Sequence, residues 1–104
     1  MKQFTTPEQT AKLIELGLLP KHIQEISDDG KLLLECMGYS IGELIEMLPI
    51  RINDYTLFIY TNWDGWIVDY NPDISVKTKF YCVEIELIDA LYDMIVKLKE
   101  EEVI

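Results

Sequence analysis

The stretch YTLFIYTNWDGWIVDY, residues Tyr55–Tyr70, decides the fold because it predicts a β-hairpin. Two runs rich in β-branched and aromatic residues flank Asn62–Gly65, and an Asp-Gly step between such runs is a strong hairpin signal. A four-residue loop, Asn62–Gly65, and a two-residue loop, Asp64-Gly65, give the same two faces, whereas a three-residue loop turns one strand over. With the two-residue loop, the opposing pairs are Trp63–Trp66, Thr61–Val68 and Ile59–Tyr70.

Successive side chains point to opposite sides of a strand, so this hairpin has two distinct faces. We expect the first face to join the core, and it carries Tyr55, Leu57, Ile59, Thr61, Trp63, Trp66, Val68 and Tyr70. The second face is unusually aromatic for a surface in water, and it carries Phe58, Tyr60, Asn62, Ile67 and Asp69. Its apolar area needs a cover, which a second copy, a partner protein, a ligand or another part of the chain could supply.

Three helices are predicted from their caps and apolar spacing. Thr6-Pro7-Glu8-Gln9 begins the first helix as a capping box with proline at the first helical position, and Gly17 ends it. Ser40 and Glu43 form a second capping box, and Pro49 stops that helix after about two turns. The longest helix covers roughly 84–101, with one apolar face made of Leu87, Ile88, Leu91, Met94, Ile95 and Leu98.

The remaining segments predict further strands. Lys77–Val83 alternates and contains Phe80 and Tyr81, while Lys31–Met37 follows a turn at Asp28-Asp29-Gly30. His22–Ser27 is either a strand or part of a short helical turn. The resulting order predicts a single α+β domain over residues 1–104, a two-layer sandwich of an antiparallel sheet with about three helices on one face.

Length and charge narrow the class of protein. With 104 residues, 49% apolar residues and a net charge of −10, the chain is predicted to be globular. The negative charge disfavours direct nucleic-acid binding and suits a basic partner. No segment approaches the ~20 apolar residues of a membrane span, and MKQFTTPEQT is no signal peptide, so we expect a cytoplasmic protein. Cys36 and Cys82 are then expected to be reduced, unbridged thiols.

No motif indicates catalysis, a metal or a cofactor. His22 is the single histidine and has no Ser or Cys motif beside it. The five glycines are isolated, so there is no phosphate-binding loop, and one histidine with two distant cysteines cannot form a zinc site. We therefore expect a protein that is not an enzyme and holds no cofactor.

The candidate binding surface is the hairpin and its flanks. Aromatic side chains and arginine are enriched where proteins grip their partners, and Arg51 is the only arginine of the chain. A nucleobase could also stack on such aromatic side chains. The residues that we assign to this surface are Arg51, Phe58, Tyr60, Trp63 and Asp69.

Three parts of the chain carry a resemblance: FTTPEQTAKL at 4–13, YSIGELIEMLP at 39–49, and ELIDALYDM at 86–94 with KLKEE at 97–101. Together they resemble small uncharacterised accessory proteins of phages and mobile elements of gut Bacteroidales bacteria. The stretches cover about half of the chain and are helix caps and helix faces, so they imply no catalytic residue. The resemblance implies an accessory role such as counter-defence in the host bacterial cytoplasm.

Three functions are consistent with these features. The first is binding and blocking of a host immune protein. The second is sequestration of a nucleotide immune signal in an aromatic cleft, and the third is an acidic immunity protein or antitoxin that neutralises a basic toxin. A homo-oligomer is compatible with each of them.

Overall fold

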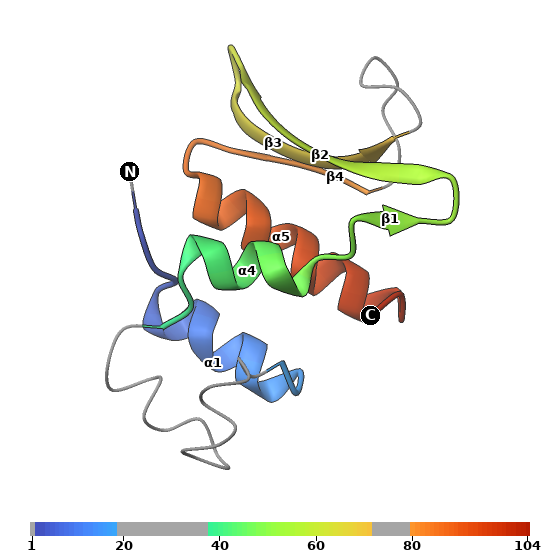
Figure 1. Ribbon diagram of the computed structural model, residues 1–104. Coiled ribbons are helices and arrows are strands. Elements are labelled where there is room, and N and C mark those ends of the chain that lie inside the picture. The colour runs from blue at the N-terminus through green and yellow to red at the C-terminus, as the bar shows by residue number, and fades with distance from the viewer. Residues whose placement is uncertain (1, 19–37, 72–79) are drawn as a thin grey trace.

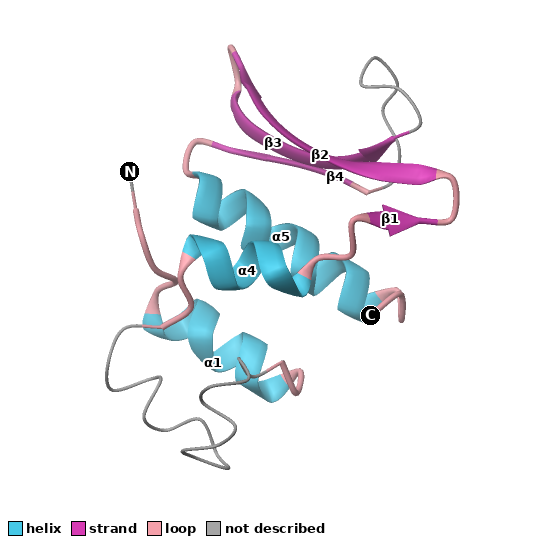
Figure 2. Ribbon diagram, viewed as in Figure 1, coloured by secondary structure: helices cyan, strands magenta, loops and turns pink. Residues whose placement is uncertain are grey.

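The computed structural model describes residues 2–18, 38–71 and 80–104. The elements in these ranges are α1 (Pro7–Glu15), α4 (Ile41–Met47), β1 (Arg51–Ile52), β2 (Tyr55–Asn62), β3 (Gly65–Asn71), β4 (Tyr81–Glu84) and α5 (Leu87–Glu100). The strands form one antiparallel sheet in the order β1-β2-β3-β4. The three helices lie on the same side of this sheet, with α1 farthest from it (Figures 1 and 2). The predicted α+β architecture is confirmed, including a C-terminal helix that is the longest.

The first two helices begin where the sequence predicts. Thr6 accepts a hydrogen bond from the Gln9 backbone N–H, and the Gln9 side chain accepts one from the Thr6 N–H. Ser40 and Glu43 make the same reciprocal pair at α4. Each capping box satisfies two backbone donors that a helix start otherwise leaves unpaired. Gly17 has a φ of +81°, which is the left-handed position expected after the end of α1.

The strand predictions are confirmed in part. β4 begins four residues after the predicted start at Lys77, and residues 72–79 lie outside the described ranges, as do the predicted strands at 22–27 and 31–37. The short strand β1 was not predicted, and it pairs with the first residues of β2. It forms because Asn53 adopts a φ of +55° and turns the chain back within two residues.

The hairpin has the register of one of its two predicted loops. Thr61 lies opposite Trp66 and Asn62 opposite Gly65, which agrees with the four-residue loop Asn62–Gly65. The pairs given for the two-residue loop, with Trp63 opposite Trp66, are wrong by two residues. The reason is local: the Asn62 Oδ1 atom accepts the Asp64 backbone N–H at 2.8 Å and places the turn at Trp63-Asp64. Because the shift is even, the side chains of the paired strands keep their predicted faces. The expectation that the whole first face joins the core is wrong for Tyr55, Thr61 and Trp63, which are exposed, and Trp63 lies in the turn.

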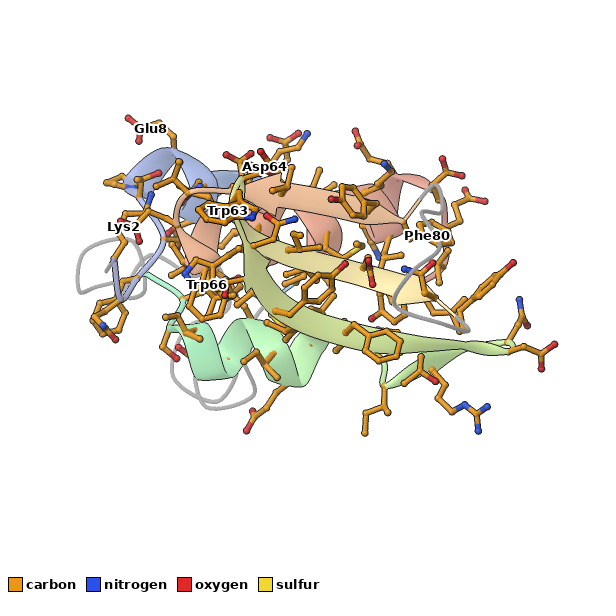
Figure 3. The ribbon with its side chains drawn as sticks, turned by 90° about the horizontal axis from the view of Figure 1, so that it is seen from above. Lys2, Glu8, Trp63, Asp64, Trp66 and Phe80 are labelled. Atoms are coloured by element: carbon orange, nitrogen blue, oxygen red, sulfur yellow. The ribbon has the colours of Figure 1, made fainter. Side chains whose placement is uncertain are left out.

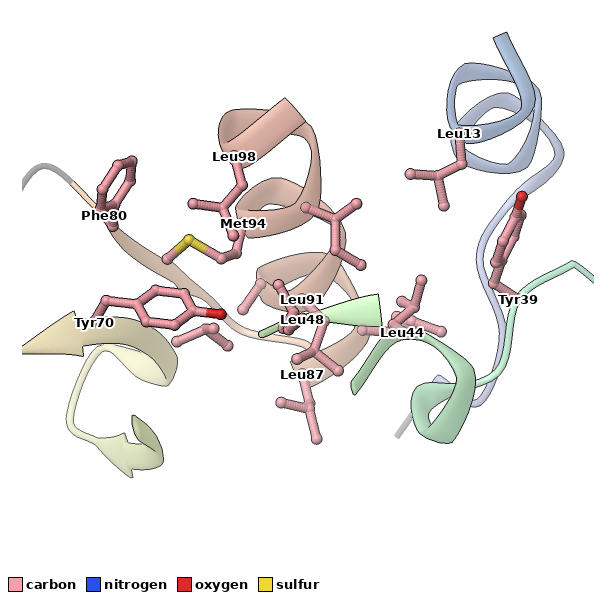
Figure 4. Close-up of a cluster of buried hydrophobic side chains, with 14 residues drawn as sticks. Leu13, Tyr39, Leu44, Leu48, Tyr70, Phe80, Leu87, Leu91, Met94 and Leu98 are labelled. Carbon is pink, nitrogen blue, oxygen red and sulfur yellow. The ribbon is translucent and has the colours of Figure 1, made fainter. Parts of the chain in front are cut away.

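One core joins the first hairpin face to the helices (Figure 4). Val68 and Tyr70 of β3 are fully buried in it, and Leu57 and Ile59 of β2 pack at its border. The apolar face of α5 supplies the largest share, and all six predicted residues of that face are buried. Leu13 of α1 and Leu44 of α4 complete the core from the other helices.

Polar contacts tie the remaining segments to this core. The Tyr70 hydroxyl donates to the Pro49 carbonyl at 2.6 Å and so joins β3 to the end of α4. The Lys2 Nζ atom and the Gln9 side chain both bind the Asp89 Oδ1 atom, at 2.7 and 2.8 Å, which fastens the start of the chain and α1 to α5. Although burial acts to raise the pKa of Asp89, these contacts with Lys2 and Gln9 lower it below its usual value.

Two further features are the length of the helices and the state of the cysteine thiols. Within the described residues, no helix is long and apolar enough to cross a membrane. Cys82 is a free thiol, and burial raises its pKa to about 11, so the thiol stays protonated and poorly reactive at neutral pH. Cys36 lies outside the described ranges.

Leu91→Ala should lower the free energy of unfolding by about 2–5 kcal/mol, because Leu91 is fully buried between the sheet and the other helices. Urea unfolding followed by circular dichroism measures this loss. Ile85→Ala is the matched control, since Ile85 is 81% exposed and its truncation should change stability by less than about 0.5 kcal/mol. A loss below about 1 kcal/mol for Leu91→Ala would contradict this packing.

Gly65→Ala should destabilise the protein by about 2–4 kcal/mol. Gly65 has a φ of +129°, and a Cβ atom added there would lie 2.5 Å from the Glu84 carbonyl oxygen, where β4 meets the hairpin. Gly42→Ala is the opposite control, because the space around Gly42 in α4 is open and alanine favours a helix by about 0.5 kcal/mol. Thermal unfolding of both variants should therefore show shifts of opposite sign.

Candidate functional site

The second hairpin face forms the outer surface of the sheet, on the side opposite the helices (Figure 1). We call this surface the open face, and pairing across the strands arranges it in rows, because directly opposed residues share a face. Among the described ranges, no helix lies over it. The three rows are Arg51–Thr56–Asn71, Phe58–Asp69–Tyr81 and Tyr60–Ile67–Val83.

The structure brings most of the predicted binding residues together on this face. Phe58 and Asp69 are directly opposed, Tyr60 lies in the next row, and Arg51 lies in the row on the other side. Trp63 is separate from them, because it occupies the turn at the hairpin tip, where its side chain is fully exposed (Figure 3). The predicted residues therefore form one aromatic and acidic cluster with an isolated tryptophan at its far end.

Sequence reasoning missed four members of the face, of which Thr56 follows from simple alternation along β2. Tyr81 and Val83 join it from β4, and Asn71 joins it from the end of β3. The alternation of Phe80 and Tyr81 carried the signal for Tyr81, since two successive strand residues must point to opposite faces. Asn71 gave no such signal, because Asn-Pro reads as a turn.

Asp69 is the most unusual group of the open face. It is fully buried, although its cross-strand neighbours are the half-buried rings of Phe58 and Tyr81. The Tyr60 hydroxyl donates to its Oδ2 atom at 3.1 Å, while its Oδ1 atom has no hydrogen-bond partner among the described residues. The fold therefore buries a carboxylate oxygen without satisfying it, which costs free energy.

The titration of this cluster reflects its burial. Burial raises the pKa of Asp69, and interactions with Tyr60 and Asn71 offset only part of that rise. Burial, the hydrogen bond to Asp69 and the nearby Tyr81 hydroxyl raise the pKa of Tyr60 to about 12, so Tyr60 remains a proton donor. Neither polar atom of the buried Asn71 side chain has a hydrogen-bond partner in the described part of the chain. Two adjacent polar side chains are thus poorly satisfied beneath aromatic rings.

The sheet also presents strand edges beside the open face. Within the described ranges, β4 pairs only with β3, and β1 pairs with β2 only at Tyr55 and Thr56. Edge strands carry unpaired backbone donors and acceptors that can accept another strand. Val83, on the β4 edge, is 36% exposed, so apolar area continues from the open face to this edge.

Two carboxyl groups, those of Glu84 and Asp93, interact on the helix side of the sheet. Burial and the neighbouring carboxylate of Glu84 raise the pKa of Asp93 to about 7. Glu84 is the last residue of β4 and Asp93 lies in α5, and Ile85 and Glu86 connect the strand to the helix. Among the described residues, no group of three His, Cys, Asp or Glu side chains is arranged to hold a metal ion.

Comparisons of the chain with protein-family models, with curated proteins and with solved structures found no match.

Asp69→Asn should raise the free energy of unfolding at pH 7 by about 1 kcal/mol, because it removes a buried charge and keeps an oxygen for the Tyr60 hydroxyl. The folded state binds the Asp69 proton more tightly than the unfolded chain, so the advantage of asparagine should shrink as pH falls toward 4. Asp64→Asn, at the exposed turn, is the matched control and should change little. Urea unfolding at both pH values measures the effect, and a destabilised Asp69→Asn would contradict it.

Glu84→Gln should weaken the pH dependence of stability. Asp93 titrates near pH 7 when folded, against an ordinary pKa of 3.8, so the protonated form stabilises the fold below about pH 4. That stability is lost as pH rises through 7. Without the Glu84 charge the pKa of Asp93 should fall, and urea midpoints at pH 5 and pH 8 should converge. Glu46→Gln on the exposed side of α4 should leave the dependence unchanged.

Proposed function

We propose that this protein is a non-catalytic binding protein that captures another protein on the open face of its sheet. The observation that carries the proposal is the chemistry of that face: three half-buried aromatic rings, two aliphatic side chains and a buried, incompletely satisfied carboxylate. Helix caps and core packing account for the helices, but no other described element packs on this face. Half-exposed aromatic rings beside polar groups are typical of protein interaction sites.

The biological setting that we propose is an accessory protein of a phage or mobile element, acting in the host bacterial cytoplasm. The support is the resemblance of the segments 4–13, 39–49, 86–94 and 97–101 to proteins of that kind. Counter-defence by blocking a host immune protein needs only tight binding, which agrees with the lack of a catalytic motif in the sequence. A net charge of −10 favours a partner with a basic surface, whether an immune protein or a toxin.

Sequestration of a nucleotide is the second candidate. Asn71 and Asp69 could read the edge of a base that stacks on the rings of the open face. Charge argues against it, because Arg51 is the only cationic side chain that the described strands place on that face. Thermal shifts with cyclic and linear nucleotides separate the two functions, since only sequestration predicts stabilisation by a nucleotide.

The test of protein capture compares variants in a host-lysate pull-down with identification of the bound protein. Phe58→Ser with Tyr60→Ala should abolish retention of the specific partner, because both side chains are half-buried on the open face and carry little of the core. Ile45→Ser is the matched control, since it removes a 38% exposed apolar side chain from α4.

Circular dichroism checks that each variant is folded, and light scattering gives its mass. A partner retained equally by the folded double variant would contradict the proposal. If instead the wild type is a dimer and the double variant a monomer, the open face is an interface between two copies of the chain.

A further inference from the structure

We propose that the row Phe58–Asp69–Tyr81, with Tyr60 beside it, is a subsite for an arginine side chain of the partner protein. The inference rests on the proposed function, which it deepens by naming the chemical group that the open face recognises. Phe58 and Tyr81 flank the Asp69 carboxylate directly from the neighbouring strands, and Tyr60 reaches it from the next row. A carboxylate surrounded by three aromatic rings provides both kinds of attraction that a cation finds in proteins.

The unpaired acceptor atoms of the site favour a ligand that donates hydrogen bonds. The Asp69 Oδ1 atom is a buried acceptor with no partner in the described ranges, and both the Oδ1 acceptor and the Nδ2 donor of the Asn71 side chain also lack one. The Tyr60 hydroxyl already serves the second oxygen of Asp69. A ligand that supplies several N–H donors would satisfy the carboxylate and the amide oxygen together.

Arginine fits these acceptors better than lysine. Its guanidinium group is planar, carries five donors in a fixed fork and stacks on aromatic rings, so it can bind two acceptors while its flat face lies on a ring. An ammonium group is a more strongly hydrated point charge, and its removal from water would cost more. Among the described residues, Arg51 is the one cationic side chain on the open face, and it lies in the row of Thr56 and Asn71 and not beside Asp69. The cation that we propose for the subsite therefore belongs to the partner protein.

Access to the site requires movement of a ring, since the Asp69 side chain is fully buried. Tyr60 is the ring that we expect to move, because it is half-buried and lies on β2, whose outer edge beyond Leu57 has no paired strand among the described residues. A single hydrogen bond of 3.1 Å joins its hydroxyl to Asp69. Tyr60→Phe removes that bond but keeps the ring, so it should ease entry without removing the aromatic surface.

Nuclear magnetic resonance with single amino-acid probes tests the subsite without the partner. N-acetyl-arginine methylamide should shift the Asp69 carboxyl carbon and the Phe58, Tyr60 and Tyr81 ring signals, saturating in the millimolar range expected for so small a ligand. N-acetyl-citrulline methylamide, which has the same shape without the charge, should bind at least tenfold more weakly. The buffer contains 0.15 M NaCl, which screens the general attraction of a negative protein for cations.

Variants complete the experiment. Asp69→Asn should weaken binding of the arginine probe at least tenfold, Tyr60→Phe should bind it at least as tightly as the wild type, and Asp64→Asn should leave it unchanged. Shifts that persist in Asp69→Asn, equal binding of citrulline, or no shift in the wild type would overturn the proposal. Equal shifts from N-acetyl-lysine methylamide or tetramethylammonium would overturn the choice of arginine.

The two proposals can fail separately. If the arginine probe does not bind while Phe58→Ser with Tyr60→Ala still abolishes partner capture, the open face binds a protein by apolar contacts alone. If the probe binds and capture is unaffected by that double variant, the cation subsite stands and the proposed function does not.

Discussion

The packing of one helix face against one sheet face is the constraint on which the rest of the structure depends. The apolar stripe of α5 lies against the core-facing residues of β3 and β4 and, on its other side, against α4 and α1 (Figure 4). Lys2 and Gln9 are tied to Asp89 of the same helix. Because α5 contacts the sheet with one side and the helices with the other, loss of its stripe would separate the two layers. The sheet needs this support, since a hairpin alone is at best marginally stable in water.

Local chemistry explains why much of the architecture could be predicted. Capping boxes at Thr6 and Ser40, the positive φ of Gly17 and the apolar period of α5 each depend on residues within a few positions of one another. The same is true of the two hairpin faces, because successive side chains of a strand point to opposite sides. The choice between the two predicted loops could not be made from the sequence, because it depends on a side-chain hydrogen bond of Asn62 and on the approach of β4 to Gly65. Neither of these appears in a propensity or a dipeptide signal.

In the candidate site, some features follow from the sequence and others do not. Phe58, Tyr60 and Asp69 could be assigned to one face from the sequence, because alternation is local. The burial of Asp69 could not, because it depends on which elements meet around β3, and Tyr81 reaches the same row from a different strand. The pairing of Glu84 with Asp93 has the same origin, since its two members belong to a strand and a helix brought together by packing. Contacts between elements determine which acidic groups have shifted pKa values. The sequence shows 19 acidic residues but does not show which of them come into contact.

The alternation within β2 and β3 also governs how this surface can change. Core residues and surface residues share the same strands at successive positions, so either set can be substituted while the other is kept. Insertion or deletion of a single residue in β2 would be different, because it would exchange the two sets and place Phe58 and Tyr60 against α5. The hairpin can therefore acquire a new binding specificity by replacing every second residue, but its strands cannot change in length by one residue without loss of the fold.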